Sequence, residues 1–187
     1  RIYNRESCNN IELGMHYASK KHKINFSSFY MHRNNPQLRL AHQYTSDPTS
    51  FDYATYNAKT AYHYGFEADF IINFSDFLKI SNSLSILKTY VSEFEYRDKI
   101  YGDRELSHSP NQKYSIALVY NFSKYIKGLK INIESNYIGE FYFEEQNDNK
   151  SDPYNLLDLS IQYKYKNFIL SLWSKNITNK KYMGCPF

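Results

Sequence analysis

The sequence has no apolar run long enough to cross a membrane as a helix. Such a helix needs about 20 consecutive, mostly apolar residues, and polar residues interrupt every apolar run of this 187-residue chain well before that length. The mean hydropathy of -0.68 is also low for a helical membrane protein. Transmembrane strands pass this test differently, because their water-facing half is polar and lowers the average.

Residues that build metal sites and catalytic centres are few and scattered. The chain has 2 Cys, Cys8 and Cys185, which lie near opposite ends and belong to no CxxC or Cys/His cluster. Its 6 His are dispersed without an HExxH motif, and no nucleophile-base arrangement can be recognised. We therefore expect no enzymatic activity, no cofactor and no metal site. The net charge of +4 is mild and its Lys and Arg are dispersed, so we also expect no nucleic-acid binding.

Turn-forming residues are scarce too, with 6 Gly and 5 Pro, whereas aromatic residues make up 18% of the chain, including 20 Tyr and 13 Phe. Several of them lie near the ends of apolar-polar alternations: Tyr30, Tyr62, Tyr64, Tyr90, Phe141, Tyr142, Tyr163 and Tyr165. Tyrosine at such a place can set its ring at the edge of the acyl region and its hydroxyl among headgroups. High strand propensity alone is the other reading of the same pattern.

The clearest local pattern lies at residues 157–173. Apolar side chains occupy every second position from Leu157 to Tyr165, and a short link around Lys166 and Asn167 leads to a second apolar run ending at Trp173. This alternation is typical of a strand with two unlike faces, and so short a link predicts a hairpin.

The same alternation predicts about eight strands, at residues 11–19, 24–30, 58–74, 78–86, 114–122, 129–143, 157–165 and 168–175. No segment of useful length has a helical period. The links alternate between short turns and long polar segments at 33–56, 93–108 and 144–152. We therefore expect an all-β fold, an antiparallel transmembrane β-barrel segment whose short turns lie at one rim and long loops at the other. On its apolar face we expect these side chains to contact lipid: Tyr64, Phe66, Leu118, Ile131 and Leu159.

Four short motifs resemble those of TonB-dependent outer-membrane receptors. Residues 172–182 (LWSKNITNKKY) resemble the "sLwgkNLtdkkY" segment near the end of that family. Residues 65–67 (GFE) resemble its "GvE" motif, residues 109–110 (SP) its "aP" step before a strand, and residues 153–158 (PYNLLD) its "y.l.d" strand opening. Their order and spacing fit the family over nearly the whole chain.

The resemblance implies that residues 1–187 are the C-terminal portion of the barrel domain, about eight strands of a 22-stranded barrel in the bacterial outer membrane. It implies uptake of a scarce nutrient such as a ferric siderophore, energised through TonB. The implied partners are outer-membrane lipid, the receptor's own plug domain, TonB and a small-molecule ligand such as a metal chelate. The plug lies upstream in the family. The family's final alternating strand has no counterpart in residues 183–187 (MGCPF), where Pro186 cannot donate to a strand ladder.

Two long segments carry the side chains that we expect to contact an anionic ligand, since receptor loops are where ligands are captured. The candidates are Arg33, Arg39, His42 and Tyr44 in the first segment and Arg97, Tyr101 and Arg104 in the second. Two other functions remain open from the sequence. One is a passive porin-like channel with the same wall, and the other is a soluble β-sandwich that binds carbohydrate.

Overall fold

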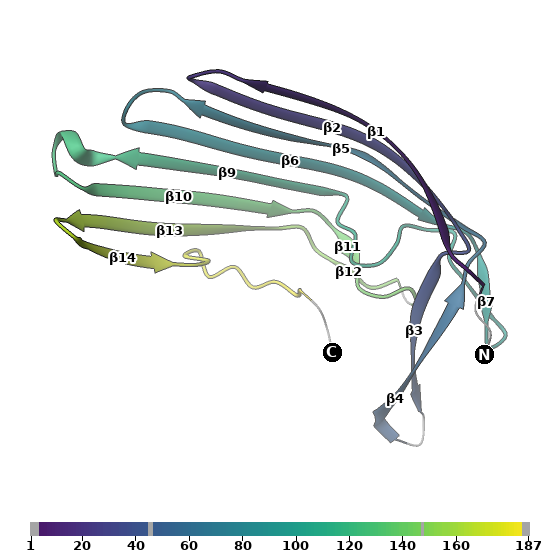
Figure 1. The fold of residues 1–187 in the computed structure, drawn as a ribbon. Coiled ribbons are helices and arrows are strands. Elements are labelled where there is room, and N and C mark those ends of the chain that lie inside the picture. Colours follow the sequence, from purple (N-terminus) through teal and green to yellow (C-terminus); the bar gives the residue numbers. More distant parts are fainter. Residues whose placement is uncertain (1–3, 45–46, 147, 185–187) are drawn as a thin grey trace.

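The computed structural model describes residues 4–44, 47–146 and 148–184, which form one large antiparallel sheet with smaller hairpins at one end (Figure 1). The all-β expectation is confirmed. In spatial order the eight strands of the sheet are β1 (Ser7–Ala18), β2 (His22–Asn34), β5 (Thr60–Asn73), β6 (Leu78–Val91), β9 (Gln112–Asn121), β10 (Leu129–Ile138), β13 (Tyr154–Tyr165) and β14 (Phe168–Ser174).

The connections alternate in length as the sequence predicts. The four short turns, at residues 19–21, 74–77, 122–128 and 166–167, gather at one end of the sheet, and the three long connections gather at the other (Figure 1). The strand order follows the chain order, because every large strand pairs with its sequence neighbour. In the part of the chain that the structure describes, β1 and β14 are the two edges and do not pair with each other.

The long connections contain more structure than the sequence indicated. The first holds the hairpin β3 (Gln37–Tyr44) and β4 (Asp47–Asn57), the second holds β7 (Phe94–Tyr96) and β8 (Lys99–Tyr101), and the third holds β11 (Phe141–Tyr142) and β12 (Lys150–Ser151). The only described helix is the 3-10 turn η1 (Phe122–Lys124). Within the described ranges, no helix is long and apolar enough to span a membrane.

Several expected strand ends are wrong. Strand β1 begins at Ser7, so exposed Cys8 lies inside the first strand rather than before it. Strand β2 continues to Asn34, which places Arg33 in the wall and not in a loop. Strand β10 ends at Ile138 instead of continuing through Phe143. Cys185 lies outside the described residues.

The register places most of the apolar side chains of the eight strands on one face, although some, such as Trp173 and Ile169 of β14, lie on the other. Directly opposed residues of an antiparallel pair point to the same side, and Leu118 is opposed by Ile80 on β6 and by Ile133 on β10, which in turn opposes Leu159. The five residues expected to contact lipid therefore share one face. The charged residues Glu67, Asp69, Glu134, Asp158 and Lys164 share the other.

Tyrosines border the apolar face at both ends of the sheet. Near the long connections Tyr62 lies between Tyr30 and Tyr90, with ring centroids 6.2 and 6.3 Å away. Near the short turns, Tyr120 on β9 is directly opposite Ile131 on β10, and Tyr163 on β13 is directly opposite Leu129 on β10. Mostly aliphatic residues and some phenylalanines occupy the rows between, an order typical of the aromatic girdles of transmembrane barrels.

Gly65 permits a close approach of β5 to β6. A Cβ atom at this position would lie 2.1 Å from the backbone oxygen of Ile86, closer than any real contact. Since the clash is with backbone, no side-chain rotation can relieve it. Gly65 therefore serves the close packing of the two strands.

Candidate functional site

The candidate site is the surface formed by the three long connections, which have a small core of their own. Leu38 and Leu40 alternate with exposed Gln37 and Arg39 along β3, so that hairpin has one apolar side. That side packs on the end of the large sheet and on the second connection, in a cluster of Leu38, Leu40, Ala58, Ala61, Val91, Phe94, Tyr96 and Leu106. The first two connections are therefore folded against each other and not free loops.

Aromatic contacts join the two hairpins within this cluster. The rings of Tyr56 on β4 and Tyr96 on β7 lie 4.4 Å apart at 59°. Tyr101 on β8, one of the seven predicted ligand contacts, is half-buried, with its ring 5.9 Å from Phe94 and 6.3 Å from Tyr96. Its ring therefore packs within the cluster.

Arg104 joins the second connection to the third. Its side chain is only 13% exposed, and Nη1 lies 2.9 Å from Oδ1 of Asp148. Nη2 donates to the backbone oxygen of Glu144, and the guanidinium lies 4.3 Å from the centre of the Tyr142 ring. These contacts give Arg104 a structural task, although the sequence marked it as a ligand contact.

A buried carboxylate makes a second joint between the same two connections. Glu145 accepts hydrogen bonds of 2.8 Å at Oε1 from both the backbone N and the Oγ of Ser107. The neighbouring Gln146 donates from Nε2 to the backbone oxygen of Ala41 on β3. The side chains of Arg104, Glu145 and Gln146 thus link all three connections.

We predict that Arg104→Ala will loosen the third connection. It removes a hydrogen bond from a charged group to a backbone carbonyl and a ring contact, a loss of about 1–3 kcal/mol, whereas the pair with Asp148 contributes little because that partner is 96% exposed. Amide exchange across residues 139–153 in the folded receptor should accelerate about tenfold or more, since it follows the population of the open state. Arg97→Ala is the control, as Arg97 is exposed at a turn; equal exchange in both variants would contradict the structural role.

The remaining predicted ligand contacts fall into three groups. Arg33 is fixed to the wall: its Nε donates to Oε1 of Glu6 at 2.7 Å, a bond that lowers the pKa of Glu6. Arg39 and Arg97 are exposed, each over a tyrosine ring, 4.1 Å from Tyr53 and 5.5 Å from Tyr96 respectively. His42 and Tyr44 belong to β3, but their side chains lie outside the described part.

The third connection contributes charged groups that the sequence did not single out. Lys150 lies 3.0 Å from Oε1 of Glu140, which raises the pKa of Lys150, and its Nζ lies 4.5 Å from the centre of the Tyr142 ring. Together with Arg104 this places two cations on one tyrosine. Within the described ranges, no three His, Cys, Asp or Glu side chains are close enough to hold a metal ion.

Comparison with known proteins agrees with the architecture. No curated protein matches the chain. A family model described as "TonB dependent receptor-like, beta-barrel" matches residues 4–177. The chain belongs to this family. The family is one of receptors, so the TonB-dependent receptor resemblance read from the four motifs is confirmed.

Solved TonB-dependent receptor structures share the fold of this barrel segment. The ferric yersiniabactin uptake receptor FyuA from Yersinia pestis matches with a TM-score of 0.77 and 17% identity over 97% of this chain and 26% of its own. The copper transporter OprC matches with a TM-score of 0.75 and 17% identity over 95% of this chain and 26% of its own. The ferric-catecholate import receptor Fiu from K12 E. coli matches with a TM-score of 0.71 and 16% identity over 98% of this chain and 25% of its own. The chain thus spans about a quarter of the length of these neighbours.

Proposed function

We propose that this chain forms part of the barrel wall of a bacterial outer-membrane receptor that imports a scarce nutrient such as a ferric siderophore. The observation that supports it is the match to the barrel family model over residues 4–177, on a sheet with all long connections at one end. In this proposal the apolar face contacts outer-membrane lipid, and Tyr64, Phe66, Leu118, Ile131 and Leu159 lie within the bilayer. The polar face lines the lumen.

In the proposed receptor, residues 1–187 supply the C-terminal part of a 22-stranded barrel. The plug domain of the same receptor fills the lumen, and TonB energises transport through that plug. Edge strands β1 and β14 then pair with neighbouring strands of the larger barrel, which satisfies their outer backbone groups. A passive porin-like channel has the same wall without a plug, and the family match favours the receptor. A sandwich is not supported, because no second large sheet faces the first in the described residues.

The clustered long connections form the ligand-capture surface of this proposal. Arg39 and Arg97 are its exposed cations, and each guanidinium is held near a tyrosine ring. Exposed cations suit an anionic chelate, and the exposed Tyr53 ring beside Arg39 adds a flat aromatic surface, whereas the Tyr96 ring beside Arg97 is buried. Arg33, Arg104 and Tyr101 hold the surface in shape, since their side chains are engaged within the protein.

We predict that Arg39→Gln combined with Arg97→Gln will weaken ligand binding by about threefold to tenfold, the loss expected for two exposed charge contacts. The full-length receptor in cells would be offered radiolabelled iron as ferric yersiniabactin or a ferric catecholate, with a copper salt as a further probe. Lys127→Gln combined with Lys166→Gln, at the opposite end of the sheet, is the control that removes the same charge. Failure of every probe to bind or enter would refute the proposed import, and equal binding by all variants would remove Arg39 and Arg97 from the site.

A further inference from the structure

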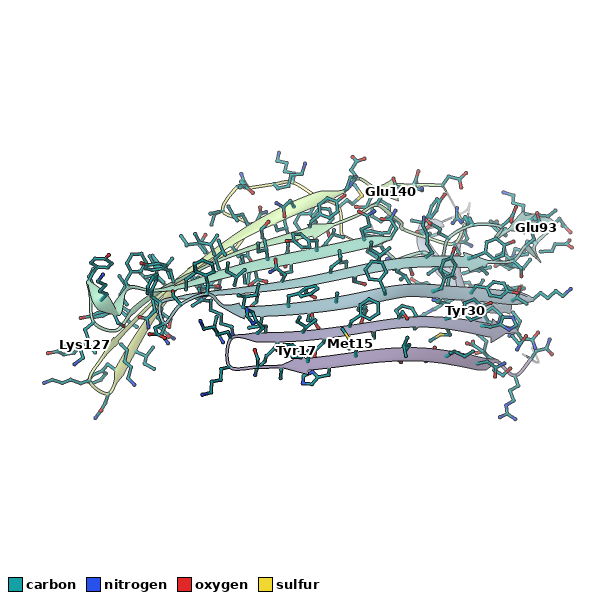
Figure 2. All side chains as sticks on the ribbon, turned by 90° about the horizontal axis from the view of Figure 1, so that it is seen from above. Met15, Tyr17, Tyr30, Glu93, Lys127 and Glu140 are labelled. Atoms are coloured by element: carbon teal, nitrogen blue, oxygen red, sulfur yellow. The ribbon has the colours of Figure 1, made fainter. Side chains whose placement is uncertain are left out.

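The four short turns gather lysines that are dispersed in the sequence. We define the short-turn rim as residues 19–21, 74–77, 122–128 and 166–167 with two strand residues on either side of each turn. Its one acidic residue is Asp76, and it has nine exposed lysines: Lys20, Lys21, Lys23, Lys79, Lys124, Lys127, Lys130, Lys164 and Lys166. Figure 2 shows Lys127 at this end and Glu93 and Glu140 at the other. The rim therefore has a strong positive charge that the net charge of +4 conceals.

The register divides these lysines into two sets. Lys23, Lys79, Lys130 and Lys164 are strand residues on the polar face; Lys130, for example, is opposed by Gln162. The other five belong to the turns themselves, beyond the last strand pairs: Lys20, Lys21, Lys124, Lys127 and Lys166. We call these five the turn lysines. They lie outside the strands, at the end of the sheet, and so do not belong to its polar face.

The rim lysines have no anionic partner among the described residues. None of the nine forms an ion pair within the ranges that the structure describes, whereas Arg33, Lys88, Arg104 and Lys150 at the other end all do. Nine like charges crowded on one rim repel one another, so the rim is complementary to an anionic surface outside the protein.

Exposed rings accompany the turn lysines. Lys124 lies 5.6 Å from the centre of the Tyr125 ring, which is 70% exposed, and Lys166 lies 5.5 Å from that of Tyr165. Phe74, Phe77, Ile126 and Phe168 are further exposed apolar residues of the same rim. Tyrosine and lysine side by side at the end of an apolar face are typical of the membrane-water interface, where the ring enters the acyl boundary and the ammonium reaches the headgroups.

We propose that the turn lysines bind the phosphate groups of anionic phospholipids in the leaflet at the short-turn end. This inference rests on the proposed function, which places the apolar face in a bilayer. A lipid surface fits better than a soluble acidic protein, because the rings beside the lysines continue the apolar face and need an acyl boundary next to the charge. Each lysine near an anionic surface favours it by about fivefold.

The test measures which lipids surround the full-length receptor in vesicles of phosphatidylcholine and phosphatidylglycerol. Spin-labelled lipids of the two kinds report their relative association with the barrel surface. We expect the unmodified receptor to prefer phosphatidylglycerol by about fivefold, and the preference to shrink at high salt, which screens exposed charges.

Two quadruple variants remove the same charge, one from the turns and the other from the polar face of the strands. Lys21→Gln, Lys124→Gln, Lys127→Gln and Lys166→Gln together should remove most of the preference for phosphatidylglycerol, with Lys20 as the one turn lysine left. Lys23→Gln, Lys79→Gln, Lys130→Gln and Lys164→Gln should keep it, because those side chains are on the polar face. No preference in the unmodified receptor, or an equal loss in both variants, would overturn the inference while leaving import intact. Failure of the receptor to insert as a barrel would overturn the proposed function and this inference with it.

Discussion

Replacing Leu118 with arginine is expected to destabilise the receptor in lipid vesicles by about 2–4 kcal/mol, the cost of an arginine near the bilayer midplane on the lipid face of a barrel. Leu118 lies on the apolar face of β9, opposite Ile80 and Ile133, in the aliphatic rows between the two sets of tyrosines. A guanidinium here has no described anionic neighbour on its own face of the adjoining strands. It would have to draw water into the hydrocarbon or bend towards an interface.

The matched control is Ala117→Arg, one residue along the same strand. Ala117 faces the polar side, where Ser81 and Glu134 oppose it. It also lines a shallow depression with Asp69, Ser83 and Ser115, so a longer side chain has room and an acidic neighbour. We expect a change below about 1 kcal/mol, the usual range for an exposed ion pair.

Denaturant titration of folding into vesicles measures both costs. A larger cost for Leu118→Arg than for Ala117→Arg assigns the apolar face to lipid. Equal costs would show that the two faces meet similar surroundings, and the lipid contacts proposed for Tyr64, Phe66, Ile131 and Leu159 would then fail together with that of Leu118.

This face assignment could be made from the sequence because strand periodicity is local. Residues 114–118 alternate strictly between apolar and polar or small side chains, and every second residue of a strand points to the same side whatever its partner is. The short turns fix the hairpin partners as well: two residues separate β13 from β14, so only an antiparallel pairing is possible. Periodicity and turn length thus predicted the eight-stranded sheet and its order.

The long connections were harder to predict because their structure depends on distant contacts. Residues 33–56 were expected to be a long polar loop, and Pro36 and Pro48 are typical turn residues, yet the segment forms β3 and β4. The two strands gain their stability from burying Leu38 and Leu40 against Val91, which lies some 50 residues away in the chain. The local sequence of residues 37–57 does not predict the burial of Leu38 and Leu40.

The roles of individual charges were hidden for the same reason. Arg33, Arg39, Arg97 and Arg104 look alike in the sequence, and only their three-dimensional partners separate two exposed cations from two that hold the structure together. The rim lysines are dispersed in the sequence, so their clustering was not predicted. Their clustering arises when four turns far apart in the chain meet at one end of the sheet.

The prediction with the largest expected effect concerns the eight strands expressed alone, which should form no stable closed pore. As an open sheet in lipid they would expose the outer backbone groups of β1 (Ser7–Ala18) and β14 (Phe168–Ser174). Each N–H or C=O left without a partner in hydrocarbon costs several kcal/mol. The edges are twelve and seven residues long, so the summed cost of their unpaired groups exceeds the free energy of unfolding of a typical domain.

Closure of β1 onto β14 would satisfy these edges but would crowd the polar face. A barrel of about eight strands has an interior just wide enough for side chains to fill it. The polar face of this sheet carries Glu67, Asp69, Glu134, Asp158 and the four rim lysines of its strands. Packed together without water, these charges would need a complete set of partners, which the described ion pairs do not include. Such a face suits a wide interior filled by water or by another domain.

The isolated chain would be purified in detergent, transferred to planar bilayers and run on gels with and without heating, beside the full-length receptor. We expect no unitary conductance from the chain and no shift of its gel mobility on heating, whereas the full-length receptor shifts as folded barrels do. A heat-modifiable monomer made of these residues alone would show that β1 and β14 pair directly. The charges of the polar face would then have to neutralise one another inside a small barrel, and the proposal that this sheet is one part of a 22-stranded receptor wall would be wrong.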